Sequence, residues 1–359
     1  MAVQRSLVIA PQWIGDAVMT EPLVARLCAR GERVTVAALP WVAPVYRAMP
    51  GVAEVVELPF QHRALQWRER RSLGSQWRQR FDRAYVCPNS LKSALLPWMA
   101  RIPTRIGYQG EMRWGLLTHR LPNPPRDRRP PMVAFYAALA GVAEPAEAGE
   151  TGQVAREPLR PRLVVSTTDQ QAALDAHDLG SRTHVVMAPG AEYGSAKRWP
   201  LQHFAQLAVQ LEHDVVLLGS AKERALCEEI VGLAQATKRT GRLLNLAGQT
   251  SLTRAFALIA SAHRVISNDS GLMHVAAALD VPQVAVFGSS SPEHTPPLSP
   301  KAQIIWLKWD PQYQPPLDCA PCFERVCPKG HLRCLQDVTP QRVLQALRET
   351  PHPGESVTG

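Results

Sequence analysis

The segment Leu7–Ala29, LVIAPQWIGDAVMTEPLVARLCA, contains the pattern that decides the fold of this protein. Leu7–Ala10 is a short apolar run typical of a buried β-strand, and Asp16–Ala29 is predicted to be a helix. Gly15, which lies between them, permits a tight turn from strand to helix. A buried strand followed directly by a helix is the repeating unit of a parallel sheet covered by helices.

The same alternation continues in two series. Further strands are predicted at Val34–Ala37, Val55–Leu58, Ala84–Cys87, Val185–Pro189, Asp214–Gly219, Arg264–Ser267 and Gln283–Phe287. Helices are predicted at Met132–Leu139, Leu201–Glu212, Glu223–Ala234, Leu252–Ala262, Leu272–Leu279 and Pro340–Leu347, the last with Thr339 as its N-cap.

The two series are separated by an interval, from about Leu121 to Arg160, that disfavours regular structure. It contains PNPPRDRRPP and the polar stretch AEPAEAGETGQVAREPLRP. We therefore predict an α/β protein with two Rossmann-like domains, residues 1–160 and 161–340, followed by a C-terminal helix and tail at 341–359.

Composition narrows the class of partner and the location. The chain has 359 residues, 45% of them hydrophobic, and a formal net charge of +9. A basic balance favours an anionic partner, which can be a nucleic acid, a membrane surface or a phosphorylated substrate. No apolar run approaches the roughly 20 residues that span a bilayer, and the N-terminal segment does not resemble a signal peptide. We expect a cytoplasmic protein that at most rests on a membrane face.

Asp16 follows the first predicted strand, at the start of a helix. Open α/β sheets bind ligands at the carboxyl ends of their strands, so Asp16 is a candidate general base. The alternative is a carboxylate that only stabilises the helix N-terminus. The G-x-G-x-x-G pattern of dinucleotide-binding proteins is missing from this turn, which argues against a dehydrogenase.

Two later motifs also lie between a strand and a helix. Residues 189–200, PGAEYGSAKRWP, combine two glycines with Lys197, and lysine is a common phosphate partner. In residues 268–274, NDSGLMH, the helix start at Ser270 and Gly271 could hold a diphosphate, with His274 one turn further on. The alternatives are a solvated basic loop for the first motif, and helix capping with a half-buried histidine for the second.

Three other features remain open from the residues alone. Residues 288–297, GSSSPEHTPP, could contact a ligand or form a rigid turn. Residues 61–83 contain seven arginines with interleaved aromatic residues, which suits nucleic acid or anionic headgroups, or a solvated helix whose tryptophans pack on the core. No D-x-D pair occurs, so a sugar transferase would have to bind its diphosphate without metal.

Four cysteines crowd into a C-x2-C-x4-C-x6-C pattern at Cys319, Cys322, Cys327 and Cys334. Four thiolates can hold a zinc ion or an iron–sulfur cluster. The spacing lacks a second C-x2-C, so reduced thiols or a redox-labile pair are the alternatives to a structural metal site.

The motifs together resemble the ADP-heptose:lipopolysaccharide heptosyltransferases of glycosyltransferase family 9. The resemblance rests on residues 13–16 (WIGD), 189–200, 268–279 (NDSGLMHVAAAL), 290–299 (SSPEHTPPLS) and 319–335 (CAPCFERVCPKGHLRCL). It implies a GT-B fold whose two domains face a central cleft, with the acceptor bound by the first domain and ADP-heptose by the second. The A-K-R-W-P loop and the cysteine-rich segment resemble type II members, which add a second heptose to the first.

The resemblance also implies roles for individual residues. Asp16 matches the proposed base, Lys197 matches the lysine that meets the donor phosphates, and the donor-binding helix start is matched by Asp269, Ser270, Gly271 and His274. Thr250 and Ser251 fall, in a looser match, where the family lines its nucleotide pocket.

The activity implied is an inverting transfer of heptose from ADP-heptose to heptosyl-Kdo2-lipid A, without metal or other cofactor. Peripheral contact with the inner membrane is compatible with this activity. Alternatives are a type I heptosyltransferase, another GT-B nucleotide-sugar enzyme such as an epimerase, and a basic nucleic-acid-binding protein. No helix-turn-helix, zinc-finger or RNA-binding motif supports the last, and we expect no nucleic-acid partner.

Overall fold

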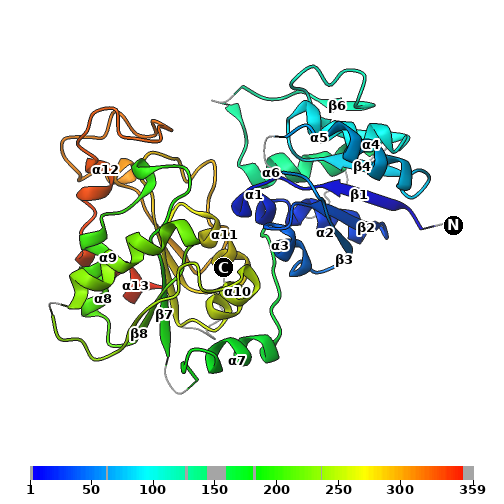
Figure 1. Ribbon diagram of the computed structural model, residues 1–359. Helices are drawn as coiled ribbons and strands as arrows, with labels where there is room; N and C mark the ends of the chain where they lie inside the picture. The colour runs from blue at the N-terminus through cyan, green and yellow to red at the C-terminus, as the bar shows by residue number, and fades with distance from the viewer. Residues whose placement is uncertain are drawn as a thin grey trace. The chain divides into compact units, whose positions relative to one another are not determined.

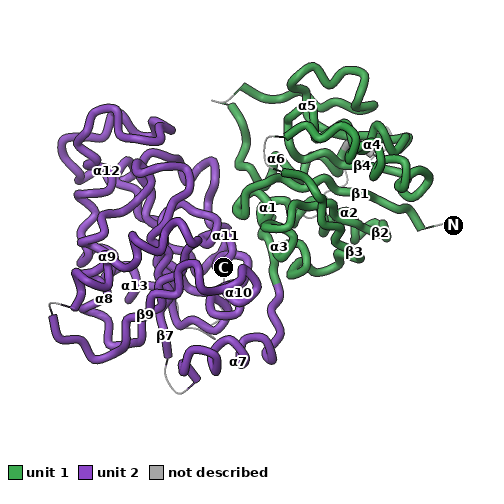
Figure 2. Tube along the Cα trace, viewed as in Figure 1, with its two compact units in different colours: residues 1–163 green, residues 164–359 purple. Residues whose placement is uncertain are grey.

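A computed structural model of the protein describes residues 3–61, 64–125, 128–143, 159–180, 183–235 and 237–350. The chain forms two compact units, unit 1 at residues 1–163 and unit 2 at residues 164–359 (Figure 2). Most of the polar interval predicted between the domains, residues 144–158, and the tail at 351–359 lie outside the described residues. None of the described helices is long and apolar enough to cross a membrane.

Unit 1 is built on a sheet whose six described strands run parallel in the order β3-β2-β1-β4-β5-β6 (Figure 1). The strands are β1 (Arg5–Ile9), β2 (Arg33–Ala38), β3 (Val52–Glu57), β4 (Arg83–Val86), β5 (Thr104–Tyr108) and β6 (His119–Leu121). The helices are α1 (Ile14–Met19), α2 (Glu21–Ala29), α3 (Ala43–Arg47), α4 (Trp67–Gln76), α5 (Leu91–Met99) and α6 (Met132–Ala137).

Unit 2 has a second parallel sheet, with its six described strands in the order β12-β11-β10-β7-β8-β9. Its strands are β7 (His184–Ala188), β8 (Asp214–Leu217), β9 (Leu243–Asn245), β10 (Arg264–Asn268), β11 (Gln283–Val286) and β12 (Ala302–Ile305). The helices are α7 (Thr167–Asp175), α8 (Leu201–Gln210), α9 (Arg224–Gln235), α10 (Leu252–Ala260), α11 (Gly271–Ala278), α12 (Arg333–Gln336) and α13 (Pro340–Glu349).

The two sheets have the same topology. Counted from its own first strand, each sheet has the order 3-2-1-4-5-6, which is the Rossmann order. The point at which the order reverses lies between β1 and β4 in unit 1, and between β7 and β10 in unit 2. Ligands of such sheets bind at this switch point, beyond the carboxyl ends of the strands. The topology therefore marks one candidate site in each unit.

The predicted strands are confirmed, with boundaries that shift by a few residues. Four strands were not predicted, namely β5, β6, β9 and β12, and three of these are the outermost or next-to-outermost strands of short length. The predicted single helix Asp16–Ala29 is wrong in one respect, because the chain forms α1 and α2 with a break at Thr20. Pro22 lacks the N–H that a continuous helix would need there.

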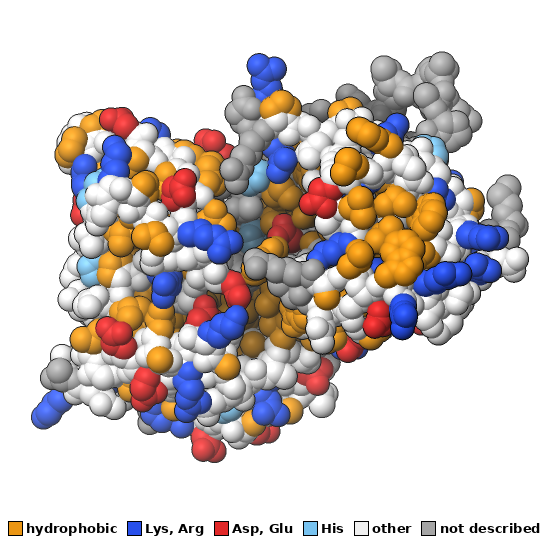
Figure 3. Space-filling model, turned by 45° about the horizontal axis from the view of Figure 1, so that its top comes forward, with side chains coloured by type: hydrophobic (Ala, Val, Ile, Leu, Met, Phe, Trp, Pro, Cys, Tyr) orange, Lys and Arg blue, Asp and Glu red, His pale blue; other side chains and the backbone are white. Residues whose placement is uncertain are grey.

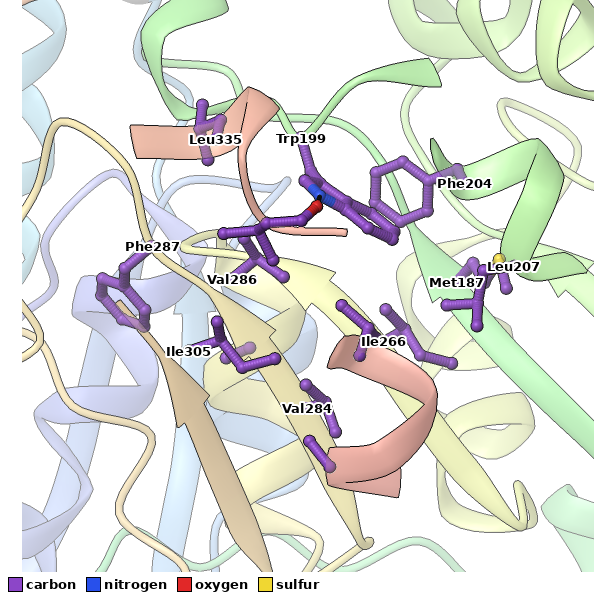
Figure 4. Close-up of a cluster of buried hydrophobic side chains, with 14 of the residues drawn as sticks. Met187, Trp199, Phe204, Leu207, Ile266, Val284, Val286, Phe287, Ile305 and Leu335 are labelled. Atoms are coloured by element: carbon purple, nitrogen blue, oxygen red, sulfur yellow. Dashed lines mark hydrogen bonds between the residues drawn. The ribbon is translucent and has the colours of Figure 1, made fainter. Parts of the chain in front are cut away.

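The core of unit 2 connects the C-terminal helix to the sheet. Trp199 is fully buried against Phe204, and its indole N–H donates to the carbonyl of Val338 at 2.8 Å (Figure 4). Thr339 caps α13 as predicted, because its hydroxyl accepts from the N–H of Arg342 at 3.2 Å. Helix α13 also packs on α8 and β11, so it belongs to the packed body of unit 2.

Candidate functional site

The switch point of unit 2 brings together two of the predicted motifs. Lys197 lies in the loop after β7, and Asp269 follows β10 directly. The ammonium of Lys197 pairs with a carboxylate oxygen of Asp269, and the two side chains are only 19% and 5% exposed. An ion pair removed from water in this way is fixed in position, and two of the three ammonium N–H donors remain to meet a second acceptor.

Asn268, the last residue of β10, holds this arrangement in place. Its buried side-chain oxygen accepts from the backbone N–H of Trp199 at 2.9 Å. Its amide nitrogen donates to the carbonyls of Pro189 at 2.7 Å and Gly190 at 3.3 Å. One amide therefore joins both ends of the Lys197 loop to the strand that carries Asp269. The sequence analysis quoted this residue in its motif but gave it no role.

The first turn of α11 faces the same place and has no side-chain cap. Ser270 is its N-cap residue, but the Ser270 side chain makes no capping hydrogen bond. Its hydroxyl is buried and has no hydrogen-bond partner among the described residues. The backbone N–H groups of Gly271 and the residues after it are therefore not satisfied by a side chain, as at helix starts that bind phosphate.

His274 lies one turn into α11 and is 5% exposed. Burial lowers the pKa of its imidazole to about 4, and the nearby Lys197 ammonium lowers it further, against an opposing effect of Asp269. The ring is therefore neutral at pH 7 and can act only as a neutral donor or acceptor.

Two serines of the predicted GSSS turn extend the site. Ser289 and Ser290 follow β11, the neighbour of β10, and both hydroxyls are buried without a partner in the described part of the chain. The N–H of Ser289 donates to the carbonyl of Ala196 at 3.3 Å, next to Lys197. A buried hydroxyl without a partner costs about 1–3 kcal/mol. A polar ligand at this edge would remove that cost.

The cysteine-rich segment supports the Lys197 loop from behind, which sequence reasoning missed. The carbonyl of Arg325 accepts from the N–H of Ala196 at 3.0 Å, and Phe323 N–H donates to Ser289 at 2.7 Å. Gly194 lies so close to Arg325 that a Cβ atom would be 2.2 Å from its carbonyl oxygen. Only glycine fits there, so the glycine of the motif allows close backbone contact rather than ligand contact.

The four clustered cysteines, Cys319, Cys322, Cys327 and Cys334, line one small cavity together with His331. All four are free thiols. Among the residues that the structure describes, no group of three or more His, Cys, Asp or Glu side chains is arranged to hold a metal ion. The structural metal site therefore stays a prediction.

Thr250 and Ser251 lie at the same sheet edge but after β9, the outermost strand, two strands away from β7. Ser251 caps α10, since its hydroxyl accepts from the N–H of Arg254 at 3.2 Å. The structure therefore groups Lys197 with the α11 start and leaves these two residues to one side.

Asp16 occupies the switch point of unit 1, in the first turn of α1 after β1. The phenol of Tyr136, from α6, donates to a carboxylate oxygen of Asp16 at 3.0 Å. Burial raises the pKa of Tyr136 well above 10, and the Asp16 charge raises it further, so the phenol stays protonated as a donor. Tyr136 was not predicted as a site residue, because 120 positions separate it from Asp16.

The arginine-rich stretch at 61–83 is partly structural. Trp77 and Phe81 are buried and stack edge to face, as the solvated-helix alternative predicts. Arg70 is buried, and Arg80 pairs with Glu54. Arg63 lies outside the described residues, whereas the side chains that remain exposed on or next to α4 are those of Trp67, Arg68, Arg71 and Arg78.

Comparison with known proteins agrees with this geometry. The family model for glycosyltransferase family 9 (heptosyltransferase) matches residues 70–332. Lipopolysaccharide heptosyltransferase 2 of Escherichia coli K12 is 43% identical over 96% of this chain and 97% of its own. Lipooligosaccharide heptosyltransferase 2 of Haemophilus ducreyi is 37% identical over 96% of this chain and 99% of its own.

A solved structure is also similar. That of E. coli ADP-heptose LPS heptosyltransferase II superposes with a TM-score of 0.80 at 40% identity, covering 96% of this chain and 98% of that one. The fold is thus the predicted GT-B type of α/β fold, and the protein is a glycosyltransferase. The chain belongs to glycosyltransferase family 9, the heptosyltransferases.

The buried, neutral His274 predicts a specific pH dependence of stability. Its folded-state pKa of about 4 lies below the 6.5 of an unperturbed histidine. The neutral ring therefore stabilises the fold fully above pH 6.5, and this contribution is lost as the pH falls towards 4. Between pH 7.5 and 4.5, His274→Gln should lose about 2 kcal/mol less of its unfolding free energy than the wild type.

Urea denaturation at the two pH values measures this difference. His119→Gln, a change at an exposed histidine of β6, is the matched control and should behave as the wild type does. Equal pH dependence in wild type and His274→Gln would contradict the buried neutral state.

Proposed function

We propose that this protein transfers L-glycero-D-manno-heptose from ADP-heptose to the first heptose of heptosyl-Kdo2-lipid A, with inversion at the anomeric carbon. The observation that carries the proposal is the pairing of Lys197 with Asp269 beside the uncapped start of α11. This arrangement suits a nucleotide diphosphate. The names and near full-length similarity of the relatives support heptose as the sugar and the type II acceptor.

The donor diphosphate would be bound by unit 2 without a metal ion. Lys197 supplies a cation at the phosphates, and the first N–H groups of α11 supply oriented donors. Ser270, Ser289 and Ser290 have buried hydroxyls that can complete the shell. We assign Thr250 and Ser251, further along the same edge, to the nucleoside side of the pocket.

The chemical step would be a single displacement with Asp16 as general base. Its carboxylate takes the proton from a hydroxyl of the acceptor heptose, and the oxygen forms a bond to the anomeric carbon of the donor. The bond from that carbon to the phosphate oxygen breaks at the same time, and ADP leaves with its charge met by Lys197 and α11. Tyr136 orients the carboxylate through its hydrogen bond.

The location follows from the acceptor, which is a membrane glycolipid. We infer a cytoplasmic enzyme that contacts the cytoplasmic face of the inner membrane peripherally. The exposed Trp67, Arg68 and Arg71 on α4 support this contact, because arginine and tryptophan together suit anionic headgroups. The remaining alternatives are a type I heptosyltransferase and a nucleotide-sugar epimerase.

Acceptor dependence tests the proposal and separates its alternatives. Purified protein with ADP-heptose and EDTA should release ADP only when heptosyl-Kdo2-lipid A is present. Release with Kdo2-lipid A would indicate a type I enzyme, and turnover of donor without acceptor would indicate an epimerase or hydrolase. No ADP release under any of these conditions would refute the proposed donor.

Replacement of the base tests the mechanism. Asp16→Asn keeps the size of the side chain but removes the proton acceptor, so turnover should fall by about 10²–10⁴. ADP affinity should not change, since the diphosphate is assigned to unit 2. Glu69→Gln, on exposed α4, is the control. Normal turnover in Asp16→Asn would exclude Asp16 as the base.

A further inference from the structure

The carboxyl edge of the unit 1 sheet exposes large apolar side chains on both sides of Asp16. Trp13 follows β1 and Trp41 follows β2, with exposed fractions of 52% and 43%. Met112 and Trp114, in the loop between β5 and β6, are exposed to 75% and 69%. Large apolar side chains gathered at one edge commonly mark an interaction site. Figure 3 shows hydrophobic side chains gathered beside Lys and Arg side chains on the face of unit 1 turned to the viewer.

The loop that presents Met112 and Trp114 is held rigidly from below. Arg113 lies between them and is 1% exposed. Its guanidinium donates to the carbonyls of Pro88, at 2.7 Å, and Tyr108, and to the side chain of Asn89 at 3.2 Å. The loop is thus tied to the strand end of β4, which is the neighbour of β1 at the switch point.

The backbone of this loop is also strained. Glu111 and Met112 have φ values of 37° and 51°, in the left-handed region that non-glycine residues rarely adopt. The Glu111 side chain accepts from the N–H of Leu91 at the start of α5, at 2.7 Å. Such strain costs on the order of 1 kcal/mol or more per residue and is typical of functional sites. The fold thus holds two apolar side chains in water at a cost.

On the other side of Asp16, Trp41 and Trp13 are brought together through Gln12. The indole N–H of Trp41 donates to the carbonyl of Gln12 at 2.9 Å, directly next to Trp13. In the sheet order, β2 and β1 precede β4 and β5. Neighbouring strands are about 4.8 Å apart, so the two aromatic groups are separated by roughly 14 Å along the edge. Asp16 lies between them.

We propose that Trp13, Trp41, Met112 and Trp114 form an acceptor platform on which the sugar rings of the glycolipid stack beside Asp16. The inference rests on the proposed function. Sugar rings have apolar C–H faces with polar rims, and indole rings offer flat apolar faces with one polar atom. A hydroxyl that gives its proton to Asp16 must lie at this edge, so the sugar that carries it and its neighbour are the first groups to reach the platform.

Equilibrium binding of deacylated heptosyl-Kdo2-lipid A tests the platform apart from turnover. Calorimetry should show that Trp114→Ala weakens binding of this water-soluble saccharide about tenfold, as expected for the loss of one aromatic contact. Trp13→Ala should weaken it similarly. Both variants should bind ADP as the wild type does, which also shows that they are folded.

Trp98→Ala is the matched control. Trp98 is exposed to 43%, like Trp41, but lies in the last turn of α5, away from the carboxyl edge. Its replacement should leave saccharide binding unchanged. Unchanged binding in Trp114→Ala and Trp13→Ala would overturn the platform.

Two further comparisons separate the possible failures. If the variants weaken binding only of the intact, acylated acceptor in vesicles, the surface contacts lipid and the platform is refuted. If the wild type binds the deacylated saccharide through these residues but never turns over ADP-heptose, the proposed function fails and the platform stands.

Discussion

The side-chain amide of Asn268 is the contact on which the donor side of the molecule depends. It bonds to Trp199 on one end of the β7 loop and to Pro189 and Gly190 on the other. A buried amide that satisfies three backbone groups at once cannot be replaced without leaving polar atoms unpaired in the core. Through it, the ammonium of Lys197 is held beside Asp269 and the start of α11.

The same loop is supported from two further directions. The Trp199 indole is buried and bonded to Val338, and the backbone around Arg325 and Phe323 binds Ala196 and Ser289. The cysteine-rich segment is therefore part of the support of the site, whatever its thiols bind. Unit 1 uses a comparable device, since the Tyr136 phenol fixes the Asp16 carboxylate. In both units, charged groups at a switch point are positioned by buried polar partners.

The sequence predicted what depends on local patterns. The buried strands β1, β7 and β10 are continuous apolar runs bounded by turn residues, so their places were predicted closely. The strands β6 and β9 have three residues each and only partial burial, which leaves almost no periodicity to detect. The break at Thr20 depends on Pro22, which was present in the sequence but not used.

The site was predicted in part for the same reason. Lys197, Asp269 and Ser270 belong to motifs at strand ends, where ligand contact is expected from topology alone. Tyr136, Arg325 and Arg113 act through contacts with residues distant in sequence or through the backbone, and no spacing rule reveals such pairs. The tryptophans of the arginine-rich stretch divide between core and surface, and only the packed structure distinguishes the buried Trp77 from the exposed Trp67.

The central claim is that unit 2 binds the donor diphosphate through Lys197 and the α11 start without a metal ion. Calorimetric titration of ADP in EDTA tests it directly. Lys197→Met should weaken ADP binding about 10- to 100-fold, the loss of one charge-assisted contact. Lys238→Met, at an exposed lysine between α9 and β9, should have no effect. Equal affinity in all three proteins, or ADP binding that requires a divalent cation, would contradict the account.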